Sequence, residues 1–242
     1  MELSSGKIKE NYSIVQAEIE RSVRLTGRNF EDVNLVVVTK GQPLSVVRSA
    51  IKAGIYHLGE NYVEEASQKI KAISEGTETK VEWHMIGHIQ SRKARKVCEL
   101  FDIVHSVDSV KLAKRLNRYA KDIGRMLPIL LECNVSGEKS KFGWMAWDDE
   151  RWDGLLADFI QISSLSNLEI KGLMTVAPYL HLMEDTRQNF IRLRCLREYL
   201  KVHISACDWS ELSMGMSSDY QIAIQEGATI VRIGTAILGK RS

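Results

Sequence analysis

The feature that most constrains the fold of this chain is a regular alternation of short apolar runs with longer amphipathic segments. Eight runs are typical of buried strands, at residues 35–39, 56–58, 81–86, 103–106, 128–134, 168–175, 212–214 and 230–233. Strands that alternate with helices predict a parallel sheet with right-handed crossovers. Eight such units close into a barrel more readily than they extend an open sheet, and 242 residues fit a (β/α)8 barrel of about 250.

An additional helix is predicted at the N-terminus, over residues 5–26, where apolar side chains recur at spacings of three and four and Gly27 follows. No linker rich in Pro, Gly or Ser divides the chain, so we expect one α/β TIM barrel domain over residues 1–242. An open doubly wound sheet is the alternative. It is weakened because Lys40-Gly41-Gln42-Pro43, after the first strand, has no Gly-x-Gly-x-x-Gly pattern. Asp108 is predicted to cap the helix that starts at 109.

Composition limits the possible partners and compartment. A net charge of +2 argues against nucleic acid as the main partner. The four cysteines form no Cys-x-x-Cys pair, which favours reduced thiols. The first residues have no apolar core for a signal peptide, and no uncharged apolar run approaches the about 18 residues of a membrane span. We therefore expect a cytoplasmic protein that does not bind membranes.

In a barrel of this kind the chemistry lies at the carboxyl ends of the strands. Residues predicted at or near such ends are Lys40, Asn61, His84, Asn134, Thr175, Gly215 and Gly234. Lys40 follows the run Val36-Val37-Val38-Thr39, and a lysine at a strand tip can hold an aldehyde as a Schiff base if burial lowers the pKa of its amine. The alternative for Lys40 is a stem that covers apolar surface with its ammonium in water. Lys171 is a rival lysine, but it lies in the first half of its strand.

Two segments near the C-terminus are predicted to bind phosphate together. They are residues 213–219, Ser-Met-Gly-Met-Ser-Ser-Asp, and residues 232–235, Arg-Ile-Gly-Thr. Barrel enzymes frequently bind phosphate with the loops after strands seven and eight, where glycine lets an oxygen approach backbone N–H groups and hydroxyls donate further bonds. The alternative is an ordinary helix cap and a tight turn. A lysine with a phosphate site is what pyridoxal phosphate requires, and Arg232 would then donate to its pyridine nitrogen.

Two other groups of residues are assigned no ligand. His84 and His88 have the spacing of a helical metal pair, but Val-Glu-Trp before His84 indicates a strand, so no metal site is predicted. The segment 135–149 is interpreted as a mobile surface loop with a packed aromatic cluster around Phe142, Trp144 and Trp147.

The chain resembles the pyridoxal phosphate homeostasis proteins, whose fold is that of the alanine racemase N-terminal domain. The segments that carry the resemblance span the chain in one order: 37–40 (VVTK), 58–62 (LGENY), 84–90 (HMIGHIQ), 106–108 (SVD), 134–139 (NVSGEK), 172–174 (GLM), 212–219 (LSMGMSSD) and 231–235 (VRIGT). The resemblance implies an internal aldimine of pyridoxal 5'-phosphate on Lys40. The cofactor site it implies comprises Lys40, Asn61, His84, Met214, Gly215, Ser217, Arg232, Gly234 and Thr235.

The implied function is intracellular pyridoxal phosphate homeostasis by a monomeric carrier that supplies apo-enzymes, with no efficient catalysis of its own. A racemase needs a base on each face of the substrate. In full-length alanine racemases the second base is a tyrosine from an appended domain of a partner subunit, whereas this chain ends seven residues after Thr235. The alternative is a pyridoxal phosphate-dependent amino-acid racemase of low activity. A lysine-dependent barrel aldolase would place its lysine deep in a later strand.

Overall fold

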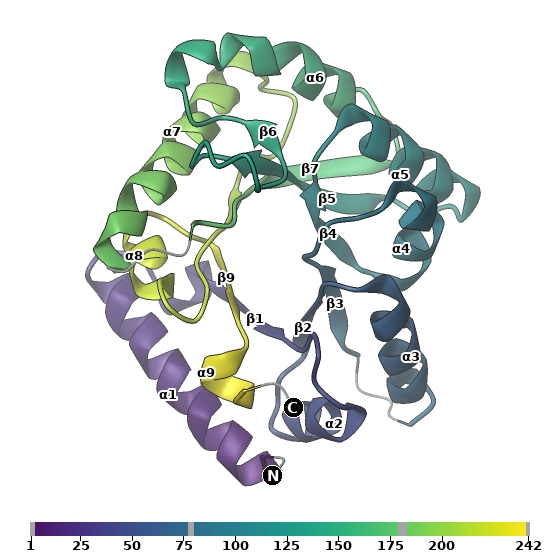
Figure 1. The fold of residues 1–242 in the computed structure, drawn as a ribbon, viewed down its shortest axis with the longest axis vertical. Coiled ribbons are helices and arrows are strands. Elements are labelled where there is room, and N and C mark those ends of the chain that lie inside the picture. Colours follow the sequence, from purple (N-terminus) through teal and green to yellow (C-terminus); the bar gives the residue numbers. More distant parts are fainter. Residues whose placement is uncertain (1–2, 77–79, 179–182, 241–242) are drawn as a thin grey trace.

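The computed structural model describes residues 3–76, 80–178 and 183–240. Eight parallel strands of the described chain form a closed ring, in which β1 pairs with both β2 and β9 and β4 pairs with β5 (Figure 1). The strands are β1 Asn34–Val38, β2 His57–Glu60, β3 Glu82–Met85, β4 Ile103–Val107, β5 Leu127–Asn134, β7 Leu168–Met174, β8 Glu211–Ser213 and β9 Ile230–Ile233. The predicted (β/α)8 barrel is therefore confirmed.

Helices surround the ring and follow its strands in turn (Figure 1). The α-helices are α1 Ser5–Arg24, α2 Leu44–Lys52, α3 Val63–Ser74, α4 Ala94–Leu100, α5 Val110–Asp122, α6 Asp153–Ser163, α7 Arg187–His203, α8 Tyr220–Gln225 and α9 Thr235–Leu238. Short 3-10 turns lie at Phe30–Asp32, Ser91–Lys93, Asp149–Arg151 and Met183–Thr186. No helix of the described residues has the length and apolar character needed to cross a membrane.

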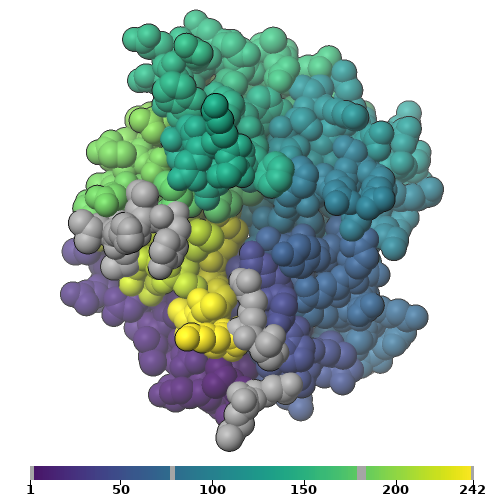
Figure 2. Space-filling view, viewed as in Figure 1, coloured from purple at the N-terminus to yellow at the C-terminus, as the bar shows by residue number. Residues whose placement is uncertain are grey.

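The predicted N-terminal helix is present as α1, which packs against α2, α8 and α9. Its apolar stripe, with Ile8, Val15 and Ile19, is buried. Because α9 spans only four residues, it covers little of the barrel, and α1 shields the side that a longer last helix would cover. Figure 2 shows the N-terminal helix in purple beside the C-terminal segment in yellow. The side-chain amide of Asn11 joins them by donating to the Ile237 carbonyl at 3.0 Å.

The interior of the ring differs from the layer between ring and helices. The layer is a continuous apolar core, whereas the interior has a small apolar cluster of Val36, Leu130, Met174 and Ile230. Buried polar side chains also face the interior, and they include His84, His105, Glu132, Ser213 and Arg232. A buried polar group is costly unless it is hydrogen-bonded, so these residues point to a function beyond packing.

Three local expectations differ from the structure. Ser109, and not Asp108, caps α5, with its hydroxyl accepting from the Leu112 amide at 3.3 Å. Asp108 instead pairs with His88. The segment 135–149 contains a two-residue strand, β6 Trp144–Met145, which pairs with β5 outside the ring. The packed aromatic cluster expected there is found for Trp144, which packs edge-to-face against Phe159, but Phe142 and Trp147 are exposed.

Candidate functional site

A cavity of about 570 Å³ opens at the carboxyl ends of the strands. Six of the nine residues predicted for the cofactor site line it: Lys40, Asn61, Ser217, Arg232, Gly234 and Thr235. Val38, Ile86 and Val176 provide apolar walls. The structure does not bring His84, Met214 or Gly215 to the lining, since His84 lies deeper in the barrel and Met214 packs in the core. Lysine, arginine and hydroxyl groups from strands far apart in the sequence thus face one space.

A buried ionic network positions the loop that carries Lys40. Lys69 Nζ lies 2.7 Å from both the Thr39 carbonyl and Glu60 Oε1, and it also binds Glu65 at 2.5 Å. Glu65 in turn accepts from the Gly41 amide at 2.7 Å. The backbone on both sides of Lys40 is therefore fixed by charged side chains. Burial raises the pKa of Glu60, although Lys69 and Thr39 oppose this effect.

The loops after β8 and β9 meet at the wall of the cavity. Ser217 Oγ accepts from the Gly234 amide at 3.3 Å, which joins the two loops directly. Gly215 has φ +93°, and a Cβ there would lie 2.6 Å from the Cβ of Ala223, so glycine is required for this turn. At Gly234 a Cβ would approach the Val38 carbonyl to 3.1 Å. The two loops thus form a glycine and hydroxyl surface of the kind that accepts a phosphate.

Arg232 is held on the cavity wall by two hydrogen bonds. Its Nη1 donates to Ser213 Oγ at 2.5 Å and its Nη2 to the Thr175 carbonyl at 2.8 Å. Burial lowers the pKa of Arg232 to about 10, and the charges of Glu132 and Asp219 oppose this shift. Arg232 therefore stays protonated at neutral pH and donates hydrogen bonds in a fixed direction.

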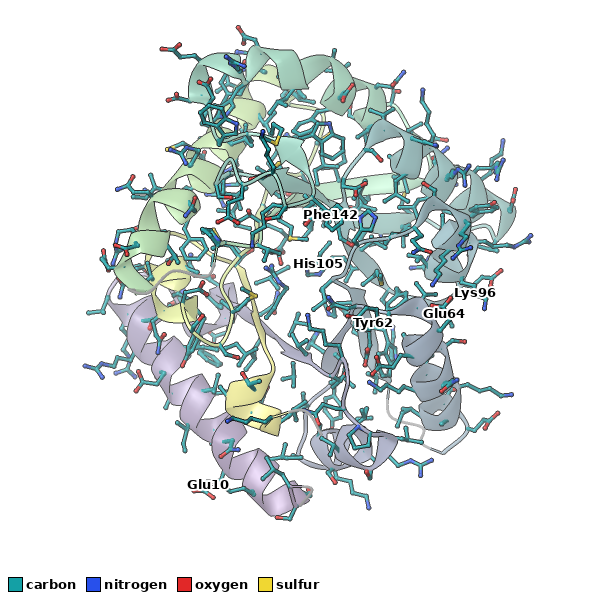
Figure 3. All side chains as sticks on the ribbon, viewed as in Figure 1. Glu10, Tyr62, Glu64, Lys96, His105 and Phe142 are labelled. Carbon is teal, nitrogen blue, oxygen red and sulfur yellow. The ribbon has the colours of Figure 1, made fainter. Side chains whose placement is uncertain are left out.

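His84 belongs to a string of polar side chains within hydrogen-bond distance of one another, which lies deeper in the barrel than the cavity. Its Nδ1 lies 3.0 Å from His105 Nε2, and His105 Nδ1 lies 2.9 Å from Ser213 Oγ, which also binds Arg232. Burial lowers the pKa of both His84 and His105, although Glu82 opposes the shift at His84, and this favours the neutral form of both rings. Figure 3 labels His105 inside the ring of strands. Sequence periodicity gave no signal for His105, because the direction of its side chain depends on how β4 is tilted in the ring.

A second cavity of about 440 Å³ adjoins the first and shares Asn61, Ile86 and Val176 with it. Glu132 lines this second cavity, and burial raises the pKa of its carboxyl group to about 7. Phe142 stacks on His88 at its edge, with ring centroids 3.9 Å apart. Glu132 was not predicted as a site residue, although a charged residue within the apolar run of β5 could have indicated it.

Two buried polar atoms at these cavities lack partners within the described residues. They are Asn61 Oδ1 and Glu132 Oε2. A buried oxygen without a donor costs about 1–3 kcal/mol, and Asn61 borders both cavities. Such atoms at the lining of a cavity indicate a ligand that supplies the missing hydrogen bonds.

Known protein sequences show the family of this chain. The family profile "Alanine racemase, N-terminal domain" matches residues 7–242. The "Pyridoxal phosphate homeostasis protein" of Vibrio alginolyticus is 38% identical over 237 residues, which cover 98% of each chain. The chain belongs to the pyridoxal phosphate homeostasis protein family. Another member of the family, from Pseudomonas aeruginosa, is 39% identical over 234 residues, 97% of this chain and 96% of the relative.

Solved structures show the same architecture. PipY of Synechococcus elongatus PCC7942, solved with pyridoxal phosphate bound, is 36% identical, with a TM-score of 0.82 over 96% of this chain and 100% of its own. Alanine racemase of Clostridium difficile 630 is 14% identical, with a TM-score of 0.71 over 96% of this chain and 56% of its own. The second likeness shows a common barrel fold.

Proposed function

We propose that this protein binds pyridoxal 5'-phosphate and acts in intracellular homeostasis of the cofactor, as a carrier that supplies apo-enzymes. The observation that carries the proposal is the meeting of Lys40, Arg232 and the two glycine and hydroxyl loops around one cavity. The pyridoxal phosphate bound in PipY and the names of the family's members support it. When bound, this cofactor supplies an aldehyde that condenses with amines and a ring that withdraws electrons.

The residues of the cavity fit the three polar parts of this cofactor. Lys40 Nζ would hold the aldehyde carbon covalently. The Ser217 hydroxyl, the Gly234 backbone and the Thr235 hydroxyl would hold the phosphate, and Thr235 is exposed on the cavity wall. Arg232 would donate to the pyridine nitrogen and keep it unprotonated. The Oδ1 of Asn61, which has no partner among the residues that the structure describes, provides one further acceptor for the ligand or its water.

The attachment to Lys40 is tested by reduction with borohydride in the presence of pyridoxal phosphate. We expect a pyridoxyl label on the peptide with Lys40 and none after Lys40→Ala, while circular dichroism stays unchanged because Lys40 lies on the cavity wall and not in the apolar core. Lys171→Ala is the matched control and keeps the label. A label on Lys171, or no label in the unchanged protein, would refute the assignment.

We further propose that catalysis by this protein is inefficient. Among the described residues that line the first cavity, Lys40 is the one side chain that can serve as a general base, once its amine is deprotonated. Arg232 only donates. A racemase needs a second base, and an unprotonated pyridine nitrogen makes the ring a weaker acceptor of electrons.

Incubation with L-alanine in deuterated water tests this second part. We expect exchange of the α-proton and formation of D-alanine to remain below about 1 per second, the low end of ordinary enzymes. The cofactor should still pass to an added apo-enzyme, because transfer requires only the lysine and an open cavity. Faster turnover would favour the racemase alternative.

A further inference from the structure

Three side chains that the proposed function does not use converge at the amino-terminal end of the barrel. His57 and Glu82 are register partners at the starts of β2 and β3, and His84 is two residues further along β3. Side chains two residues apart on a strand share a face, so Glu82 and His84 both point into the ring. Glu82 Oε1 lies 3.1 Å from His84 Nε2 and 3.5 Å from His57 Nδ1, and the two nitrogens are 3.4 Å apart.

We propose that His57, Glu82 and His84 bind one divalent transition-metal ion of the Zn²⁺ class. Ligands at about 2.0–2.1 Å from a tetrahedral ion are about 3.3 Å from one another. The three observed separations, 3.1, 3.4 and 3.5 Å, bracket that value. A point equidistant from the three atoms lies about 1.9 Å from each in their plane, so an ion just above the plane reaches ordinary bond lengths.

The chemistry of the donors agrees with this choice of ion. Two imidazoles and one carboxylate suit Zn²⁺ and its neighbours in the first transition row, whereas Mg²⁺ and Ca²⁺ prefer oxygen ligands alone. The site is also accessible from water. The side chains of His57 and Glu82 are 46% and 44% exposed, while that of His84 is 4% exposed. An ion would therefore keep at least one coordination position open to solvent.

The buried side of His84 provides the outer support that a metal-binding imidazole usually has. His84 Nδ1 faces His105 Nε2 at 3.0 Å, and His105 Nδ1 faces Ser213 Oγ at 2.9 Å. An ion on His84 Nε2 leaves the proton of the neutral ring on Nδ1, which then donates to His105. His105 in turn donates to Ser213. An outer partner of this kind fixes the orientation of the ligand ring.

Without an ion, the hydrogen bonds along this string run in the opposite direction. His84 Nε2 then donates to Glu82, His105 Nε2 donates to His84, and the Ser213 hydroxyl donates to His105. Both arrangements pair every ring nitrogen of the two buried histidines, so the ion decides which tautomer each of them adopts. The string ends on Arg232 at the cavity, which connects the metal site with the opposite end of the barrel.

Metal titration of the full-length protein tests the proposal. The exposed Cys195 is first changed to serine, because a surface thiol also binds Zn²⁺. After removal of metal with a chelator, we expect calorimetry to show one Zn²⁺ per chain, and Co²⁺ to give the visible absorption of a site with nitrogen and oxygen ligands. His57→Ala and Glu82→Gln change half-exposed side chains and should leave the fold intact.

Each of these two variants should bind Zn²⁺ at least about 100-fold more weakly, since loss of an outer partner alone costs about 10–100-fold. His203→Ala is the matched control, because His203 is exposed on α7 and far along the chain from the site, and it should bind as the parent does. No binding by the parent, or equal binding by His57→Ala, would overturn the proposal.

Nitrogen-15 spectra of the histidine rings give a second measurement that adventitious binding would not change. Zn²⁺ should move the proton of His84 from Nε2 to Nδ1 and that of His105 from Nε2 to Nδ1. Unchanged ring shifts of both histidines at saturating Zn²⁺ would also overturn the proposal. The borohydride label on Lys40 is independent of these outcomes, so a failure here leaves the proposed function untouched.

Discussion

At the carboxyl ends of the strands, Asn61 Oδ1 and Glu132 Oε2 are buried without a partner among the described residues, whereas at the amino ends Lys171 pairs with Glu169 and Asp208 in contact with water. The carboxyl ends also hold the buried ion pair of Lys69 and Glu60. Unpaired or buried polar groups reduce stability, while exposed pairs contribute little either way. The carboxyl ends therefore accept a cost in folding free energy that a bound ligand can offset.

The two regions also differ in how strongly substitutions should act. At the carboxyl ends Lys69 is held by the buried Glu60, so removal of Lys69 leaves Glu60 buried without its counter-charge. Around Lys171, at the amino ends, water can replace a side chain that is removed. The predictions below test this contrast, from the largest expected effect to the smallest.

Lys69→Ala should produce the largest loss of stability. It removes the ammonium group between Glu60 and Glu65 and leaves Glu60 buried without its counter-charge. Breaking a buried pair on one side costs about 3–5 kcal/mol, and protonation of Glu60 limits the loss because burial already raises its pKa. Urea unfolding at about pH 8 measures the change. The double variant Lys69→Met with Glu60→Gln should recover part of it, and a loss below about 1 kcal/mol would contradict the contrast.

Glu132→Gln should change how stability depends on pH. Burial raises the pKa of Glu132 from its ordinary 4.5 to about 7 in the folded protein. At low pH the carboxyl group is protonated in both states. As pH rises from about 4.5 through about 7, the unfolded chain releases the proton first, so this group lowers stability by up to about 3 kcal/mol.

Glu132→Gln has no carboxyl group to titrate at this position. Its free energy of unfolding, relative to that of the parent, should therefore increase between about pH 5 and about pH 8. Unfolding of both cofactor-free proteins at the two pH values measures the difference. Glu169→Gln, at an exposed carboxylate, is the control and should stay parallel to the parent. If the stability of Glu132→Gln changed with pH in the same way as that of the parent does, the pKa of the Glu132 carboxyl would not be raised.

Thr235→Val should weaken binding of pyridoxal phosphate but hardly change binding of unphosphorylated pyridoxal. The hydroxyl lines the cavity beside Gly234, and the loss of one hydrogen bond to an anion is worth about 1.5–3 kcal/mol, or about tenfold to a hundredfold. Equilibrium titration with both ligands, followed by absorbance, checks the ratio. Equal weakening toward both would place the phosphate elsewhere.

Much of the fold could be predicted because long periodic segments determine it. The eight apolar runs predicted eight strand–helix units, and that number favoured the closed ring that is observed. Among the strands and α-helices, β6 and α9 escaped prediction, because two or four residues are too few to show a period. The cap of α5 was misplaced by one residue, because Asp108 and Ser109 are both good capping residues and only the backbone geometry distinguishes them.

The residues of the site also fall into two groups, those that could be predicted from the sequence and those that could not. Lys40, Asn61 and Gly234 could be placed from the sequence, since they follow strands and the ends of parallel strands share one edge. His105 and Glu132 lie within strands, so their direction depends on tilt and register around the ring, which periodicity leaves open. The convergence of His57, Glu82 and His84 likewise depends on the register of β2 against β3.

Lys171→Ala should have the smallest effect. Lys171 binds Glu169 at 3.2 Å and Asp208 at 2.8 Å, and these partners raise its pKa. All three side chains contact solvent, and exposed pairs of this kind contribute about 0–1 kcal/mol. The free energy of unfolding, measured with urea, should therefore change by less than about 1 kcal/mol. Since a lysine held as a cation by two carboxylates is a poor nucleophile, its removal should also leave the borohydride label unchanged. A loss comparable with that of Lys69→Ala would show that the two ends of the barrel do not differ in the way their charges are supported.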